Sequence, residues 1–213
     1  MLEPKNSNVA ILNAIERSLI NAARNFELAA NGLAGTMDWA AYRMPEYWIV
    51  SMLMQDLQQM GVAAFPEVRI SHDLEEAGKG IISGGQKMSS ARYPLLKGCK
   101  IDLFAFDHSG AEGSPVLRAA LEVKGPKSNF RDFPGDIVRL DRLAEGRGDD
   151  QQFIFAYATA PLTDEKAAIE EQAVRRALQS GISKDWQFKA LRGVGDGMQW
   201  GKDRSGYVFI AHR

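Results

Sequence analysis

Two stretches of sequence decide the fold: KIDLFAF at residues 100–106 and VLRAALEVK at residues 116–124. Side chains on a β-strand alternate between two faces, and the first stretch is apolar on both faces apart from Asp102 and the opening lysine. That pattern is typical of a central strand covered on both sides. The second stretch has one apolar face, while its other face carries Glu122 and Lys124 at the end of the strand.

The acid inside the first stretch needs a partner, because a carboxylate among apolar side chains is costly without a cation, a metal ion or hydrogen-bond donors. Residues 107–110 read as a turn, so the two strands can form a hairpin. An antiparallel pairing would set Glu122 beside Asp102, and Lys124 would project from the same face as Glu122. Two carboxylates and an ammonium group at a strand end suit phosphodiester hydrolysis with Mg²⁺, which prefers hard oxygen ligands.

Hydrophobic spacing predicts the other elements around these two strands. The order of elements indicates an α/β fold, a mixed central β-sheet flanked by helices, with an N-terminal helical extension. We expect a single domain, in which residues 1–44 form a helix and a linker and residues 45–213 form the α/β unit. The expected helices span residues 7–30, 45–60, 135–145 and 163–179, and the expected strands span residues 62–70, 152–159 and 207–211, the first being an edge strand because it contains Pro66.

Composition excludes several classes of protein. The 26 Lys and Arg against 27 Asp and Glu give a net charge of −1, so contacts with nucleic acid would have to come from local basic patches. No apolar run reaches the ~18 residues of a membrane span, and no secretory signal is visible. The single cysteine, Cys99, excludes an internal disulfide. We therefore expect a cytoplasmic protein with no membrane segment.

The two stretches together resemble the PD-(D/E)xK nuclease superfamily, whose motif is an acid on one strand and then Asp/Glu-x-Lys at the end of the next. Here the motif reads Asp102 followed by Glu122-Val123-Lys124, and Lys100-Ile101 stands in place of the proline. The expected order α-β-β-β-α-β over residues 45–159 also resembles the restriction-endonuclease-like core. The resemblance implies a nuclease that depends on Mg²⁺, with Mn²⁺ as a substitute, and that acts on DNA.

The resemblance also implies a role for each motif residue. The carboxylates of Asp102 and Glu122 and the carbonyl of Val123 would ligate the metal ion, and Lys124 would position the attacking water. Many members carry a further glutamate on the helix before the sheet, and Glu46 fits that place; it would support a second metal ion or its water. An alternative is that this acid, next to Pro45, only complements the helix dipole.

Basic residues on both sides of the motif are candidates for contact with phosphate. Several lie in a glycine-rich segment, residues 71–98, which could be a mobile cover over nucleic acid or a β-hairpin that shields the sheet edge. The candidate nucleic-acid-binding residues are Lys87, Arg92 and Lys97 in this segment and Lys127, Arg131 and Arg139 after the second strand.

Three alternatives stay open on the sequence alone. Glu122 and Lys124 could form a plain ion pair. Asp102 could be a buried acid that pairs with an arginine such as Arg139. The whole chain could be a catalytically inactive nuclease-like fold that serves as a nucleic-acid-binding or protein-interaction module, and a homodimer is compatible with either function.

Overall fold

The computed structural model describes residues 9–22, 25, 46–69, 100–107, 116–126, 128–144, 151–159, 162–179, 186–193 and 206–213. Residues 9–22 form a helix, called here the N-terminal helix. The elements that follow are α2 (Glu46–Gln59), β1 (Ala63–Arg69), β2 (Lys100–Asp107), β3 (Val116–Lys124), α4 (Phe133–Ala144), β4 (Gln152–Ala158), α5 (Asp164–Gln179), β5 (Gln187–Gly193) and β6 (Gly206–His212).

The strands form one six-stranded sheet in the order β1-β2-β3-β4-β6-β5. Only β3 and β4 run parallel among these neighbours, and α4 provides the connection that a parallel pair needs. The other neighbouring pairs are antiparallel. The predicted mixed α/β fold is therefore confirmed, and so is the edge position of the strand that contains Pro66.

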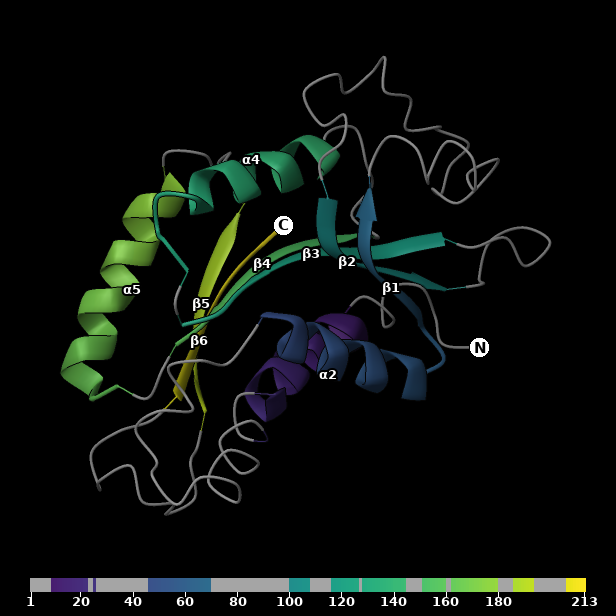
Figure 1. Ribbon diagram of the computed structural model, residues 1–213, viewed down its shortest axis with the longest axis horizontal. Helices are drawn as coiled ribbons and strands as arrows, with labels where there is room; N and C mark the ends of the chain where they lie inside the picture. The colour runs from purple at the N-terminus through teal and green to yellow at the C-terminus, as the bar shows by residue number, and fades with distance from the viewer. Residues whose placement is uncertain are drawn as a thin grey trace.

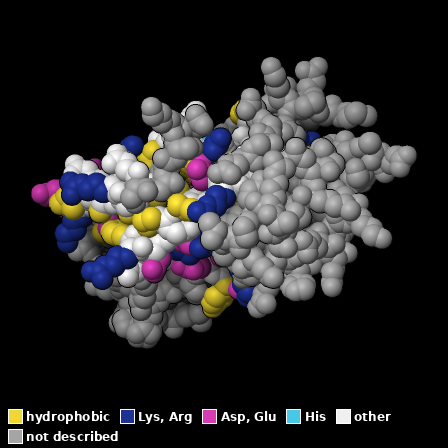
Figure 2. Space-filling model, turned by 90° about the horizontal axis from the view of Figure 1, so that it is seen from above, with side chains coloured by type: hydrophobic (Ala, Val, Ile, Leu, Met, Phe, Trp, Pro, Cys, Tyr) yellow, Lys and Arg dark blue, Asp and Glu magenta, His cyan; other side chains and the backbone are white. Residues whose placement is uncertain are grey.

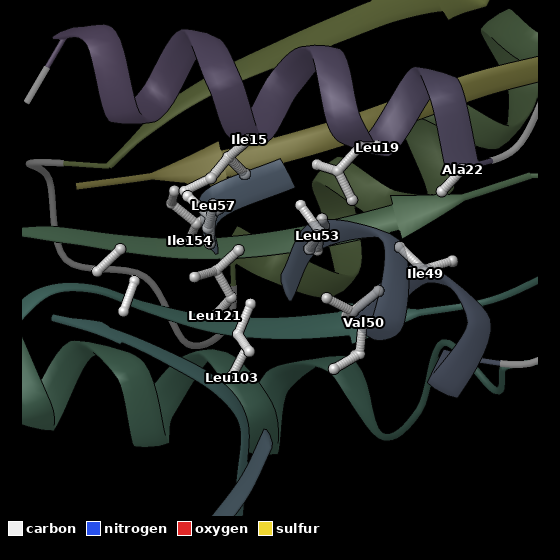
Figure 3. Packing of buried hydrophobic residues seen from close by; sticks show 14 of the residues in the cluster. Ile15, Leu19, Ala22, Ile49, Val50, Leu53, Leu57, Leu103, Leu121 and Ile154 are labelled. Carbon is white, nitrogen blue, oxygen red and sulfur yellow. The ribbon is translucent and has the colours of Figure 1, made fainter. Parts of the chain in front are cut away.

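One face of the sheet is covered by the N-terminal helix and α2, and the other by α4 and α5 (Figure 1). On the first face the packing is aliphatic, and the N-terminal helix takes part in it rather than standing apart as an extension. Figure 3 shows side chains of the two helices meeting those of the central strands: Ile15, Leu19, Ile49, Val50, Leu53 and Leu57 over Leu103, Leu121 and Ile154.

The opposite face is rich in aromatic side chains. Phe133 at the start of α4 packs against Phe155 and Tyr157 of β4, with ring centroids 4.9 and 5.3 Å apart. Burial of such large rings dominates the energetics of a core. These contacts fix the first turn of α4 over the carboxyl ends of β3 and β4.

The end of α2 has a local cause in the sequence. Gly61 has a φ of 77°, in the left-handed region that glycine adopts without steric cost. Its N–H donates to the carbonyl of Gln58, and the N–H of Val62 donates to the carbonyl of Leu57, both at 3.0 Å. This is how a glycine ends a helix, so the predicted stop at Gly61 is confirmed.

Strand β5 was not predicted from the sequence. Its two partly buried apolar side chains, Phe188 and Leu191, lie three residues apart and pack on opposite faces of the sheet. The strand lies at the sheet edge, where most of its side chains are exposed, so the two-residue alternation that marks a strand is broken.

Several predictions fall outside the described residues. They are the glycine-rich segment of residues 71–98 with Lys87, Arg92 and Lys97, the linker before Pro45, Cys99, and Lys127 after β3. In the part of the chain that is described, no helix combines the length and the apolar character needed to cross a membrane.

Candidate functional site

The pairing of β2 with β3 brings the two motif acids together. The strands are antiparallel, with Leu103 opposite Leu121. One residue further along this register, Asp102 faces Glu122. The N–H of Val123 donates a hydrogen bond of 2.7 Å to Oδ2 of Asp102, and the two carboxyl groups also share a hydrogen bond. The antiparallel pairing and the expected contact between the two acids are thus confirmed, while residues 108–110 of the predicted turn lie outside the described residues.

Burial makes this pair of acids electrostatically unfavourable. Glu122 is only 1% exposed, and its burial, followed by repulsion from Asp102, raises its pKa to about 9. Burial also raises the pKa of Asp102, although the Val123 N–H and the charge of Lys124 act in the opposite direction. At neutral pH the pair therefore carries a shared proton, unless another cation takes its place.

Lys124 ends β3 and lies among acids from three elements. Its Nζ is 3.2 Å from Oδ2 of Asp136 on α4 and 4.0 Å from Oε2 of Glu46 on α2. Burial by itself would lower the pKa of Lys124, but the charges of Asp136, Asp102, Glu46 and Glu122 outweigh it and raise the pKa. Lys124 is thus a charged ammonium group, and its ion-pair contacts are with Asp136 and Glu46 rather than a plain pair with Glu122.

Glu46 reaches the same strand end from the other side of the sheet. It is the first residue of α2, and its Oε1 accepts hydrogen bonds from Ser128 Oγ at 2.7 Å and from the N–H of Gly125 at 3.4 Å. The structure therefore brings Glu46 to the motif, as the sequence predicted. Its place in the first turn also suits the helix dipole, so both interpretations of this acid fit the geometry.

Arg139 contacts a different acid from the one considered on the sequence. Its Nε and Nη2 donate to Oε1 of Glu122 at 3.1 and 2.9 Å, and its Nη2 also donates to Oδ1 of Asp136. The open alternative of a buried pair between Asp102 and Arg139 is therefore replaced by a pair between Glu122 and Arg139. A protonated Glu122 can accept both hydrogen bonds at Oε1, so this contact does not require an ionised glutamate.

Asp136 is the site residue that the sequence did not reveal. It lies in the first turn of α4, is 5% exposed, and contacts both Lys124 and Arg139. Among the described residues, no donor forms a hydrogen bond to its Oδ2, which makes an ion-pair contact with Lys124. An acid in the first turn of a helix is already explained by the helix dipole, so the sequence held no further signal.

The candidate nucleic-acid-binding residues near the site differ in how freely their side chains could contact phosphate. Arg131 is exposed just before α4, whereas the guanidinium of Arg139 is held by two acids. Seen from the side of α4, the described surface shows basic and acidic side chains intermixed, with no broad patch of one charge in that part (Figure 2). Contact with phosphate would therefore depend on a few positions. Arg131 is one such position among the residues that the structure describes.

The oxygen atoms at the end of β3 bear on whether this site can hold a metal ion. Among the described residues, no group of three or more His, Cys, Asp and Glu side chains is arranged to hold one. The remaining set is the Asp102 and Glu122 carboxylates with the carbonyl of Val123, which are hard oxygen donors. Mg²⁺ is commonly bound by one or two carboxylates with water as the other ligands, and the mutual repulsion of the two acids favours a cation between them. The set fits a divalent cation on these grounds.

Neither the family models, nor the curated proteins, nor the solved structures with which the chain was compared gave a match. The chemistry of the site itself is therefore the guide to function.

Proposed function

We propose that this protein is a Mg²⁺-dependent nuclease that hydrolyses phosphodiester bonds in DNA, with a restriction-endonuclease-like core and a PD-(D/E)xK-type site. One observation carries the proposal: Asp102 on β2 and Glu122 on β3 face each other, and Lys124 is the last residue of β3. The element order α2-β1-β2-β3-α4-β4 supports it, because the motif then occupies the same strands as in that superfamily. Mn²⁺ would replace Mg²⁺, since it accepts similar oxygen ligands.

Asp102, Glu122 and the carbonyl of Val123 would hold the metal ion. When bound, a divalent cation at this place would activate a water molecule and neutralise charge on the phosphate. Glu122 would have to release its proton to act as a ligand, and its carboxylate and that of Asp102 would then both be available to the cation.

Lys124 would supply positive charge next to this cation. The ammonium group is held by Asp136 and Glu46 at 3.2 and 4.0 Å, so its orientation is set before substrate binds. A preoriented donor lowers the barrier because no reorganisation is needed when negative charge develops on the phosphate. Glu46, bonded to Ser128 and Gly125, would fix the loop after β3 and orient Lys124 or a water molecule.

Binding of DNA would rest on local basic residues, in keeping with the net charge of −1. Arg131 is exposed beside the start of α4 and is suited to a phosphate contact. Lys87, Arg92, Lys97 and Lys127 remain candidates from the sequence, and Arg139 could reach phosphate only by leaving at least one of its two acids.

A second candidate function is a nuclease-like module that no longer cleaves. The contact between Arg139 and Glu122 favours it, because a cationic group already lies 2.9 Å from one of the two acids that would bind metal. In such a cluster the acids already have cationic partners without a metal ion, and its role could be limited to stabilising the fold.

The two functions are separated by measuring Mn²⁺ binding by calorimetry and DNA cleavage on the wild-type chain and on Asp102→Asn. The asparagine keeps an acceptor for the Val123 N–H but loses the charge. We expect wild type to bind Mn²⁺ and cleave, and Asp102→Asn to lose more than the roughly 10–100-fold in metal affinity that outer partners of a ligand typically cost. Glu67→Gln, an exposed acid on the neighbouring strand β1, is the matched control and should change neither value.

A wild-type protein that binds DNA but neither binds Mn²⁺ nor cleaves would establish the binding module instead. Equal Mn²⁺ affinity in wild type and in Asp102→Asn would show that the metal ion does not bind at this strand end.

A further inference from the structure

Arg139 lies between two buried acids at the proposed site, Glu122 and Asp136. Glu122 on β3 is 1% exposed, whereas the side chain of Arg139 is 26% exposed. Two nitrogens of the guanidinium converge on a single oxygen, Oε1 of Glu122, and one of them also contacts Oδ1 of Asp136. The arginine thus reaches from the solvent side of α4 to the acid that would ligate metal.

A guanidinium and a divalent cation compete for the same carboxyl group. Both are attracted to its oxygens, and they repel each other at short range. A cation of charge +2 that replaces either a proton or nothing at Glu122 increases the positive charge beside Arg139. The arginine therefore opposes metal binding whether or not Glu122 carries a proton.

Asp136 provides a second position for the same guanidinium. This acid is 5% exposed on the same helix, three residues before Arg139, and it also contacts Lys124. If Arg139 left Glu122, it would keep its ion pair with Asp136, so its positive charge would still have an acidic partner.

We propose that Arg139 is a built-in counter-ion of Glu122, which the divalent cation displaces, and that Asp136 retains the freed guanidinium at the edge of the site. This inference rests on the proposed metal site. It explains how an arginine bonded to a candidate ligand is compatible with metal-dependent cleavage, and it assigns Asp136 the role of a positioning residue.

The test is the affinity for Mn²⁺ alone, measured by calorimetry without DNA, in wild type and in Arg139→Gln. Removal of one positive charge next to a divalent cation should tighten binding by about tenfold or more. A residue that merely supports the fold would instead weaken binding when it is replaced. Arg142→Gln is the matched control, because it removes the same charge from the last turn of the same helix, and its affinity should stay close to that of wild type.

Arg139→Gln leaves two acids without their arginine and could fail to fold, so a second comparison is included. Asp136→Asn/Arg139→Gln removes both charges of the contact, and its reference is the single variant Asp136→Asn. We expect the double variant to bind Mn²⁺ more tightly than Asp136→Asn by a similar factor.

The outcomes separate the inference from the proposed function. Mn²⁺ binding in wild type that is unchanged or weaker in Arg139→Gln overturns the counter-ion role and leaves the metal site standing. An equal gain in Arg142→Gln overturns it too, because the effect would then be one of general charge. No Mn²⁺ binding in wild type or in any variant overturns the metal site and this inference with it. Binding that emerges only when Arg139 is replaced supports the inference.

Discussion

The two ends of the β2–β3 pair both hold buried charges, but in different proportions. At one end, one cation meets one acid, and Arg118 donates to Asp107 at 2.5 Å. At the other end, the three acids Asp102, Glu122 and Asp136 face the two cations Lys124 and Arg139, and Glu46 adds a further acid nearby.

The excess of acid makes the second cluster the better candidate for binding a cation. A buried contact between one acid and one cation acts on stability, whereas several buried acids close together raise one another's pKa values and favour an added cation.

The largest effect is expected for Lys124→Ala at the acid-rich end. Turnover on DNA should fall by about 10²–10⁴-fold, because a positioned proton donor or acceptor typically contributes that much. Mn²⁺ affinity should be retained or increase, since the ligands are acids and a positive charge beside the cation is removed. The measurement is single-turnover cleavage together with calorimetry. Loss of the fold and of Mn²⁺ binding together would assign Lys124 a structural role as the partner of Asp136 and Glu46.

A second effect concerns stability against pH in metal-free buffer. The folded protein keeps the proton on Glu122 up to its pKa of about 9, whereas the unfolded chain releases it near 4.5. The folded state binds more protons between these values, so its stability falls as the pH rises through this window. By pH 7 the loss amounts to about 3 kcal/mol in the free energy of unfolding.

Glu122→Gln should flatten this pH dependence. The amide oxygen can still accept from Arg139, the amide nitrogen can donate to Asp102, and no charge develops. Denaturant titrations of both proteins at pH 5, 7 and 9 with a chelator provide the measurement. The same variant should not cleave DNA. Parallel pH curves for wild type and variant would show that Glu122 is not the group that titrates.

The smallest effect is expected at the end that holds Arg118 and Asp107. Asp107→Asn removes the negative charge that Arg118, which is largely buried, contacts, and should lower the free energy of unfolding by about 2 kcal/mol. Cleavage and Mn²⁺ affinity should not change, because this pair lies at the far end of the strands from the motif. A loss of cleavage in a folded Asp107→Asn protein would show that this end of the strands also contributes to activity.

Much of the fold could be predicted from local pattern. Strand β3 has the predicted bounds, and β2 differs by one residue, because both are long apolar runs with clear ends. Their antiparallel pairing was a condition of the sequence argument, and the register of the two strands meets it. Strand β5 escaped prediction because an edge strand leaves most side chains exposed and so carries no regular pattern.

The candidate site was predictable only in part. Strand alternation places Glu122 and Lys124 on one face, and the hairpin adds Asp102, since both are short-range geometric consequences of the sequence. Glu46 was predicted from its place on the helix before the sheet. Arg139 was identified as a basic residue near the motif, but its partner was not.

Local pattern in the sequence was therefore enough for the two central strands and, once these strands pair antiparallel, for the two facing acids, because both depend on the two-residue period of a strand. Only the tertiary structure decided that Asp136 and Arg139 join them. The apolar side chains of α4, Phe133, Ile137 and Leu140, set how that helix is rotated against the sheet, and this rotation turns the residues beside them toward Glu122 and Lys124. Such a contact arises from packing between distant segments, and hydrophobic spacing alone does not specify which strand a helix face will cover.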